Sequence, residues 1–111
     1  MAATGPRLKI AVLGAGAWGS ALAVHFAARH DATLWTRSET HAQAMAGARE
    51  NARYLPGVPL PASLRLSHRL DEATRDAGLL LVAVPSGGLR SLLGLLAEQA
   101  INCPLIWVCK G

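Results

Sequence analysis

A glycine motif between a strand and a helix constrains this chain more than any other feature. Residues 7–13 (RLKIAVL) predict a strand, because the continuous apolar run of residues 10–13 suits a parallel strand buried on both faces. The next six residues, GAGAWG at 14–19, follow the pattern G-x-G-x-x-G, and an alanine-rich helix is expected over 17–29. In this context the motif is typical of a Rossmann-type turn that holds a dinucleotide.

Each glycine of the motif has a predicted role. Gly14 would allow the tight turn, Gly16 would let the backbone approach a pyrophosphate, and Gly19 would let the helix lie close to the strand. Free N–H groups and the positive end of the helix dipole would then bind the phosphates. The alternative is a glycine turn between strand and helix that binds nothing.

Further apolar runs alternate with helical segments along the rest of the chain. Strands are predicted at 32–35, 79–84 and 104–108, and helices from Ser38 or Thr40 to about Arg49, over 70–75, and from an N-cap at Ser86 to about Ala100. Residues 51–66 contain three closely spaced prolines, which predict an ordered loop with a short strand near 64–66. This alternation predicts an α/β fold with a Rossmann-like, doubly wound parallel sheet, although it does not determine the strand order.

The first helix offers a more specific expectation. Trp18, Leu22 and Phe26 follow one another at four-residue steps and therefore share one helix face. We expect this face to pack on the sheet.

The end of the second strand bears on the choice of dinucleotide. The strand continues into Thr36-Arg37-Ser38, with no carboxylate before Glu39 to hold the ribose 2′-hydroxyl of NAD. Arg37 is therefore the candidate for stacking on adenine or contacting a 2′-phosphate, with Ser38 beside it. This favours NADP(H) and leaves NAD(H) open; the alternative is a solvated loop arginine.

Composition argues against several other classes of protein. The 111 residues are 51% hydrophobic and 16% charged, which excludes a disordered chain. Eleven Lys and Arg against seven Asp and Glu give a net charge of +4, but the cations are spread singly and few aromatic residues accompany them. We therefore expect no nucleic-acid binding. No apolar run approaches the length of a membrane span, and no signal peptide precedes the first strand, so we expect no membrane insertion and a cytoplasmic location.

The remaining reactive side chains form no catalytic or metal-binding constellation. Cys103 and Cys109 lack C-x-x-C spacing and are expected to be buried thiols. Surface or capping roles are expected for the histidines, and a solvated helix for the acidic residues near position 72. The residues concerned are His25, His30, His41, His68, Asp71, Glu72 and Asp76. We predict no metal site and no catalytic residue in this chain.

Four motifs in order resemble one family. They are GAGAWGSALA from Gly14, YLPG from Tyr54, VPS from Val84, and WVCKG at 107–111. Together they resemble the N-terminal domain of the NAD(P)-dependent glycerol-3-phosphate dehydrogenases of the bacterial type, over residues 9–111. That family reduces dihydroxyacetone phosphate to sn-glycerol 3-phosphate, which supplies the backbone of phospholipids.

The resemblance implies roles for individual residues. It places Ala17 and Trp18 in contact with the cofactor, and Arg37 and Ser38 at its adenosine end. Tyr54 would border the cofactor. Lys110 would bind near both the nicotinamide and the substrate, where a cation attracts the substrate phosphate; the alternative is a frayed terminal residue. Two departures from the family pattern stand out: no glycine precedes the second strand in residues 28–31, and Gly87-Gly88 follows the VPS motif.

In this family a second, helical domain carries the catalytic lysine and most of the substrate pocket. We therefore expect residues 1–111 to form most or part of the N-terminal NAD(P)-binding Rossmann domain, cut before the helical substrate domain and inactive alone. A small phosphate substrate is expected, and a homodimer stays open. The alternatives are a stand-alone nucleotide-binding Rossmann module and another dehydrogenase of the 6-phosphogluconate or β-hydroxyacid type.

Overall fold

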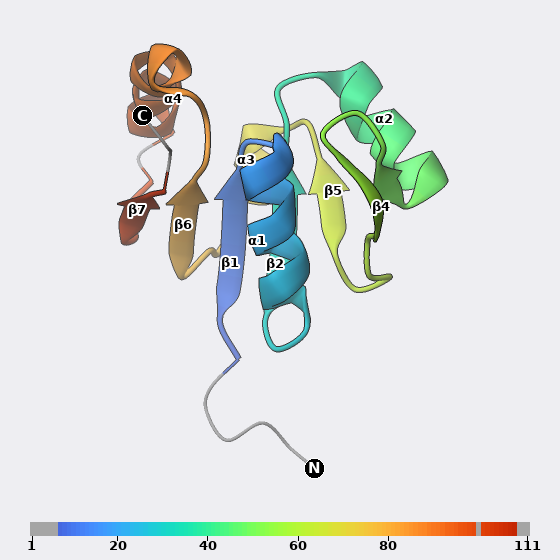
Figure 1. Ribbon diagram of the computed structural model, residues 1–111. Coiled ribbons are helices and arrows are strands. Elements are labelled where there is room, and N and C mark those ends of the chain that lie inside the picture. The colour runs from blue at the N-terminus through green and yellow to red at the C-terminus, as the bar shows by residue number, and fades with distance from the viewer. Residues whose placement is uncertain (1–6, 100, 109–111) are drawn as a thin grey trace.

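A computed structural model describes residues 7–99 and 101–108 of the chain. Its centre is a five-stranded, wholly parallel sheet in the order β5-β2-β1-β6-β7 (Figure 1). The strands of this sheet are β1 (Lys9–Leu13), β2 (Asp31–Trp35), β5 (Arg65–Ser67), β6 (Leu79–Val82) and β7 (Leu105–Trp107). The strands predicted from the apolar runs are thus confirmed. The structure also gives the order of the strands in the sheet, which the sequence does not determine.

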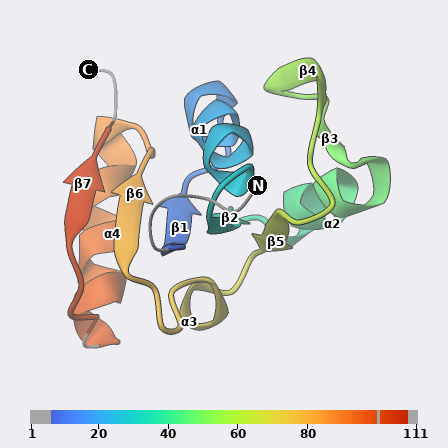
Figure 2. The ribbon, with the colours of Figure 1, turned by 90° about the horizontal axis from the view of Figure 1, so that it is seen from below.

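Within the described residues, four helices connect the strands and lie on the two faces of the sheet (Figure 2). They are α1 (Ala17–Ala27), α2 (Glu39–Ala48), α3 (Leu70–Ala73) and α4 (Ser86–Glu98). This arrangement is the predicted doubly wound α/β fold. No helix in the part of the chain that the structure describes is long and apolar enough to cross a membrane.

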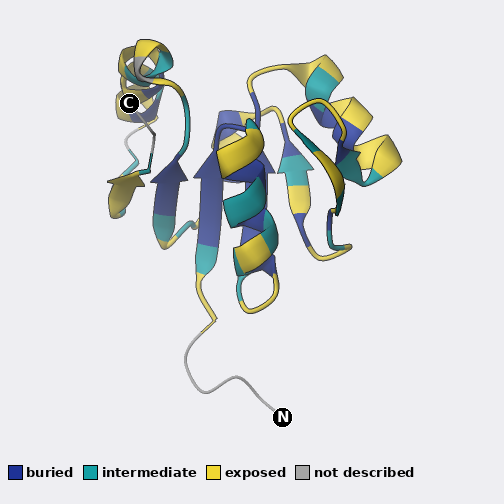
Figure 3. Ribbon diagram, in the orientation of Figure 1, coloured by how far each residue is buried: buried dark blue, intermediate teal, exposed yellow. Residues whose placement is uncertain are grey.

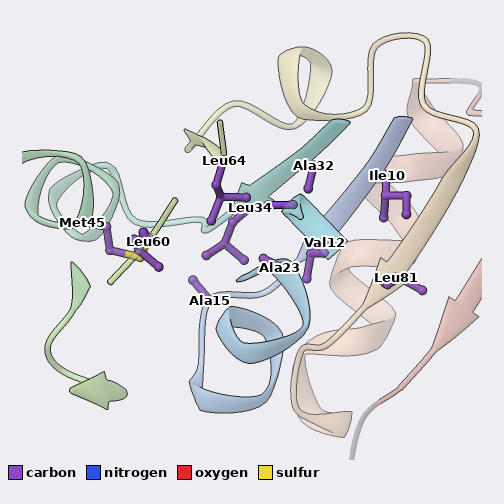
Figure 4. Packing of buried hydrophobic residues seen from close by; sticks show 11 residues of the cluster. Ile10, Val12, Ala15, Ala23, Ala32, Leu34, Met45, Leu60, Leu64 and Leu81 are labelled. Atoms are coloured by element: carbon purple, nitrogen blue, oxygen red, sulfur yellow. The ribbon is translucent and has the colours of Figure 1, made fainter. Parts of the chain in front are cut away.

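The core consists of two apolar layers, one on each face of the sheet. Successive side chains of a strand point to opposite faces, so Ile10 and Val12 join one layer while Ala11 and Leu13 join the other. The first layer includes α1 and α2 residues, among them Ala23 and Met45 (Figure 4); the second is covered by α3 and α4. The central strands are therefore buried on both faces (Figure 3), as continuous apolar runs require.

The predicted packing face of α1 is only partly correct. The residues of α1 that are buried against the sheet are Gly19, Ser20, Ala23 and Ala27. Trp18 is instead 56% exposed, while Leu22 and Phe26 are only half-buried. Small side chains allow the helix axis to lie close to the strands, so Trp18 turns away from the sheet while Phe26 packs against the margin of the core.

The proline-rich segment contains more regular structure than a loop. Strands β3 (Glu50–Asn51) and β4 (Leu55–Pro59) pair as an irregular antiparallel hairpin before β5 begins. Pro56 and Pro59 are tolerated because β4 pairs on one side only, so a missing N–H breaks no ladder between two neighbours. The Arg49 guanidinium donates to the carbonyl oxygens of Pro61 and Leu64 and so holds the segment after the hairpin.

Helix caps agree with the sequence in part. Ser38 is the N-cap of α2, and its hydroxyl accepts a hydrogen bond from the His41 N–H at 3.1 Å, so the structure selects Ser38 over Thr40 as the start of this helix. The predicted cap at Ser86 is wrong, because Pro85 occupies the N-cap position and Ser86 is the first helical residue. At the glycine-free turn after α1, His30 Nδ1 accepts a hydrogen bond from the Leu8 N–H at 3.1 Å, which joins this turn to the residue before β1. Cys103 is a half-buried free thiol, and Cys109 lies outside the described residues.

Candidate functional site

The strand order places a crevice at the carboxyl end of β1. The chain after β1 enters α1 on one face of the sheet, and the chain after the neighbouring β6 enters α4 on the other face. Ligands of open α/β sheets bind where two such loops diverge. Here a cleft of about 260 Å³ is lined by residues 14–18 of the glycine loop and residues 83–85 after β6.

The three glycines of the loop have distinct geometries. Gly14 has a φ of +120°, and a Cβ atom there would lie 2.8 Å from the carbonyl carbon and oxygen of Ala83. A Cβ atom on Gly19 would overlap the Gly14 carbonyl oxygen. Gly16 differs, since a Cβ atom there would have no neighbour within 4 Å. The turn predicted at Gly14 and the close approach predicted at Gly19 are therefore present, and Gly16 faces open space.

The N-terminus of α1 is free to receive an anion. Gly16 is its N-cap residue and provides no side-chain acceptor, and the first turn contains no acidic residue. The first N–H groups of a helix lack partners within the helix, and the helix dipole adds positive potential there. The loop and the first turn of α1, including Ala17, can thus cradle a phosphate group without any charged side chain.

Trp18 links the glycine loop to the end of β7. Its indole Nε1 donates a hydrogen bond to the carbonyl oxygen of Val108 at 2.7 Å, although the side chain is largely exposed. Val108 in turn donates its N–H to the Val82 carbonyl at 2.9 Å. The residues after β7 therefore begin at the crevice. Lys110, the predicted contact for cofactor and substrate, lies outside the described residues.

The predicted adenosine contacts lie at the same edge of the sheet, after β2. Arg37 is exposed, and its guanidinium donates to the Ser91 hydroxyl of α4 at 3.1 Å. The Ser38 hydroxyl is already the acceptor of the α2 cap, so it is not free to accept a second strong hydrogen bond at that lone pair. Of these two residues, Arg37 is therefore the one that presents an exposed charge.

Tyr54 is carried by the hairpin and is 43% exposed. Its ring packs edge-on against His41, with centroids 5.5 Å apart, and the Arg53 guanidinium lies 5.1 Å from its centre. These contacts fix the ring beside α2 while leaving a face accessible.

Sequence reasoning missed Asn51, a buried amide in β3. Its Nδ2 donates to the carbonyl oxygen of Ala15 at 2.8 Å and to the Ser20 hydroxyl at 2.7 Å. His41, expected to be simply exposed, is half-buried and lies 3.0 Å from Asn51 Oδ1. An isolated asparagine between a helix and a proline-rich segment has no spacing signature, so only the fold reveals this partnership.

The titratable side chains provide no catalytic centre within residues 7–99 and 101–108. No group of three or more potential metal ligands occurs in that part of the chain. The pKa of Asp71 is lowered by a hydrogen bond from Arg69, but this pair is exposed on α3. The acidic residues around it are solvated, as predicted.

The glycine loop and the sheet match known proteins closely. The family model described as "NAD-dependent glycerol-3-phosphate dehydrogenase N-terminus" matches residues 9–111. The chain belongs to this family. This is the family that the four sequence motifs resemble. The comparisons do not favour the alternatives, a stand-alone module or another class of dehydrogenase.

Individual relatives of this glycerol-3-phosphate dehydrogenase family agree. The glycerol-3-phosphate dehydrogenase [NAD(P)+] of Thiobacillus denitrificans is 50% identical over 104 residues, which cover 94% of this chain and 32% of that protein. The enzyme of the same name from Aromatoleum aromaticum is 51% identical over 104 residues, with the same coverage. The chain thus spans about a third of the length of these relatives.

Solved structures show the same domain. The crystal structure of the Coxiella burnetii glycerol-3-phosphate dehydrogenase superposes with a TM-score of 0.88 at 30% identity, covering 95% of this chain and 33% of that one. The Plasmodium falciparum glycerol-3-phosphate dehydrogenase gives 0.83 at 32% identity, with coverage of 95% and 33%. A 3-hydroxyacyl-CoA dehydrogenase from Archaeoglobus fulgidus, at 21% identity and 0.69, shares the fold alone.

Proposed function

We propose that residues 9–111 bind the nicotinamide dinucleotide of a glycerol-3-phosphate dehydrogenase. The observation that carries the proposal is the uncapped N-terminus of α1 beside Gly16, where a Cβ atom would meet nothing within 4 Å. A pyrophosphate needs this combination of free N–H groups and close backbone approach. The relatives' names, which specify NAD(P)+, support the same ligand.

The pyrophosphate would lie on the glycine loop, with Gly14, Gly16, Ala17 and Gly19 shaping the cradle and Trp18 flanking it. Arg37 and Ser38 would meet the adenosine end, and Tyr54 would border it from the hairpin. When bound, the nicotinamide ring supplies a hydride donor or acceptor. The contribution of this chain is to bind and orient the dinucleotide.

The choice between the two dinucleotides rests on Arg37. No carboxylate follows β2 before Glu39, and the exposed Arg37 guanidinium after β2 supports a contact to a 2′-phosphate. We propose that NADP(H) is preferred and NAD(H) accepted. Arg37→Gln should reduce the preference for NADPH over NADH by about 5- to 10-fold, since an exposed charge pair contributes about 1 kcal/mol. Arg29→Gln, at the other end of α1, should leave the ratio unchanged.

A fluorescence titration tests the site. Trp18 lies in the loop, so its emission should change when NADPH or NADH is added to the 111-residue chain. Gly16→Ala should weaken binding about 10-fold, because the added methyl group occupies the place of the pyrophosphate. Gly94→Ala is the matched control, since it also adds a methyl group to open space, on α4. A folded chain whose fluorescence does not respond at millimolar dinucleotide would contradict the proposal.

The activity of a whole enzyme containing this domain is a further part of the proposal. We propose the reduction of dihydroxyacetone phosphate to sn-glycerol 3-phosphate, with Lys110 near the nicotinamide and the substrate phosphate. The hydrogen bond between Trp18 and Val108 supports this, because it brings the chain to the crevice two residues before Lys110. We assign the chemical step to the part of the relatives that lies outside the region matched by this chain. We therefore expect no turnover from these 111 residues. Oxidation of NADPH by a full-length enzyme in the presence of dihydroxyacetone phosphate, and by this chain as a comparison, is the decisive assay.

A further inference from the structure

Asn51 is the most completely bonded buried polar side chain of the described fold. It is 1% exposed and lies in β3, 36 residues away in sequence from Ala15. Its amide meets four partners, one in the glycine loop, one in α1, one in the hairpin and one in α2. These partners are Ala15 O, Ser20 Oγ, Tyr54 N and His41 Nε2, at 2.8, 2.7, 3.3 and 3.0 Å.

The partners determine which way the amide faces. The carbonyl oxygen of Ala15 can only accept, so the amide group next to it must be the donor, Nδ2. The Tyr54 backbone N–H can only donate, so the other amide atom must be the acceptor, Oδ1. It follows that His41 donates its Nε2 proton to Oδ1. Both donor hydrogens and both acceptor positions of the amide are then used.

The bond to Ala15 has a consequence for the neighbouring peptide. In a trans peptide the C=O of one residue and the N–H of the next point in opposite directions. Because the Ala15 carbonyl points at Asn51 in the interior, the Gly16 N–H points the opposite way. Gly16 and Ala15 both line the cleft of the glycine loop. A rotation of this peptide would replace the Gly16 N–H with a carbonyl oxygen, which repels an anion.

We propose that Asn51 is a positioning residue of the nucleotide site: it holds the Ala15–Gly16 peptide so that the Gly16 N–H donates to the pyrophosphate. The inference rests on the proposed function of the glycine loop as the pyrophosphate site. Asn51 itself touches no ligand and acts through the peptide. The same amide also holds Tyr54 and His41, so the hairpin and α2 share one anchor with the loop.

Asn51→Asp is the sharpest variant, because it keeps the shape and the acceptor toward Tyr54 but replaces the donor toward Ala15 with an oxygen. The 111-residue chain, labelled with ¹⁵N, is titrated with ADP, and the Gly16 amide resonance is followed. In the parent chain we expect a large shift of this resonance. In Asn51→Asp we expect that shift to be lost and ADP to bind at least about 10-fold more weakly, as the loss of a hydrogen bond to a charged group implies.

His41→Leu is the matched control. It removes the opposite hydrogen bond of the same amide while leaving the bond to Ala15, so it should lower the melting temperature without changing the Gly16 shift or the ADP affinity by more than 2-fold. A purely structural role for Asn51 would instead make both variants lose stability and affinity in proportion. That outcome would overturn the proposal.

Two further measurements keep the test decisive. If Asn51→Asp does not fold, Asn51→Ser is judged by the same criteria, since it is neutral and too short to reach Ala15. In the parent chain the Asn51 side-chain amide protons should exchange slowly with solvent, and fast exchange would also overturn the proposal. Failure of the parent chain to bind ADP would refute the proposed function, whereas normal ADP binding by a folded Asn51→Asp refutes only the positioning role.

Discussion

The glycine loop is held in different ways on its two sides. Toward β6 it is held by steric fit: Gly14 lies against the backbone of Ala83, and Gly19 lies against the Gly14 carbonyl. Toward the hairpin it is held by polar contacts, because the amide of Asn51 bonds to Ala15 and Ser20. The side toward β6, here called the steric side, leaves no room for an added atom. The side toward the hairpin, here called the polar side, depends on matched hydrogen-bond donors and acceptors.

The two sides differ in what a substitution can do to them. Backbone atoms cannot move aside as a flexible side chain can, so an added methyl group on the steric side must displace a strand or a helix. On the polar side a lost hydrogen bond costs about 1 kcal/mol, and the cost rises when a buried partner is left unpaired. The steric side should therefore control folding, and the polar side should control the direction of peptide groups.

The largest effect is expected at Gly19. Gly19→Ala should lower the free energy of unfolding by at least about 3 kcal/mol, because its Cβ atom would overlap the Gly14 carbonyl oxygen. Gly16→Ala, in the same loop but with open space around it, should change the free energy of unfolding by less than about 1 kcal/mol. Urea denaturation of both variants measures the difference. Equal losses would break the distinction between the steric side and the open part of the loop.

An intermediate effect is expected at Ser20, on the polar side. Ser20→Ala removes one of the two acceptors of the Asn51 amide and should lower the free energy of unfolding by about 1 kcal/mol. ADP affinity should stay within 2-fold, since the bond to Ala15 remains. Ser91→Ala removes an exposed hydrogen bond to Arg37 and should change the free energy of unfolding by less than about 0.5 kcal/mol. A large loss of ADP affinity in Ser20→Ala would show that the two contacts of the amide act as one.

The smallest effect is expected outside both sides, at the exposed pair of Arg69 and Asp71. The hydrogen bond from Arg69 lowers the pKa of Asp71 below its ordinary value of 3.8. A lowered carboxyl pKa stabilises the fold at pH values above 3.8, and this contribution is lost as the pH falls through the lowered pKa. Because the pair is exposed, this contribution is small, so Asp71→Asn should leave the melting temperature at pH 7 nearly unchanged. Thermal melts of parent and variant at pH 7 and pH 3 check this reference point; a clear drop at pH 7 would contradict it.

The local signals in the sequence predicted most of the fold. Apolar runs indicate most strands of the parallel sheet, and the polar residues Ser38 and Thr40 indicate the beginning of α2, where the structure selects Ser38. The face of α1 is predicted only in part, because the four-residue spacing of Trp18, Leu22 and Phe26 indicates a shared face without saying what that face meets, and of the three Phe26 packs against the core. A helix that lies close to a sheet buries its smallest residues, here Gly19 and Ala23.

The hairpin and the anchor of the loop were not predictable from local pattern. Prolines in β4 argue against a strand, yet this strand pairs only with β3, where a missing N–H is tolerated. The bonds of Arg49 to Pro61 and Leu64, and of Asn51 to Ala15, join residues between 12 and 36 positions apart. No periodicity or motif connects such pairs.

By itself the sequence determined where the chain turns and where α1 begins, because G-x-G-x-x-G permits a φ of +120° at Gly14 and a contact at Gly19 that excludes a side chain. Those are constraints on the backbone, and they depend only on the absence of a Cβ atom. Only the tertiary structure brings the Ala15 carbonyl to a donor from β3, the contact that we propose sets the direction of the Ala15–Gly16 peptide. A hydrogen bond requires two groups to meet in space, and only the folded chain brings Asn51 to the glycine loop.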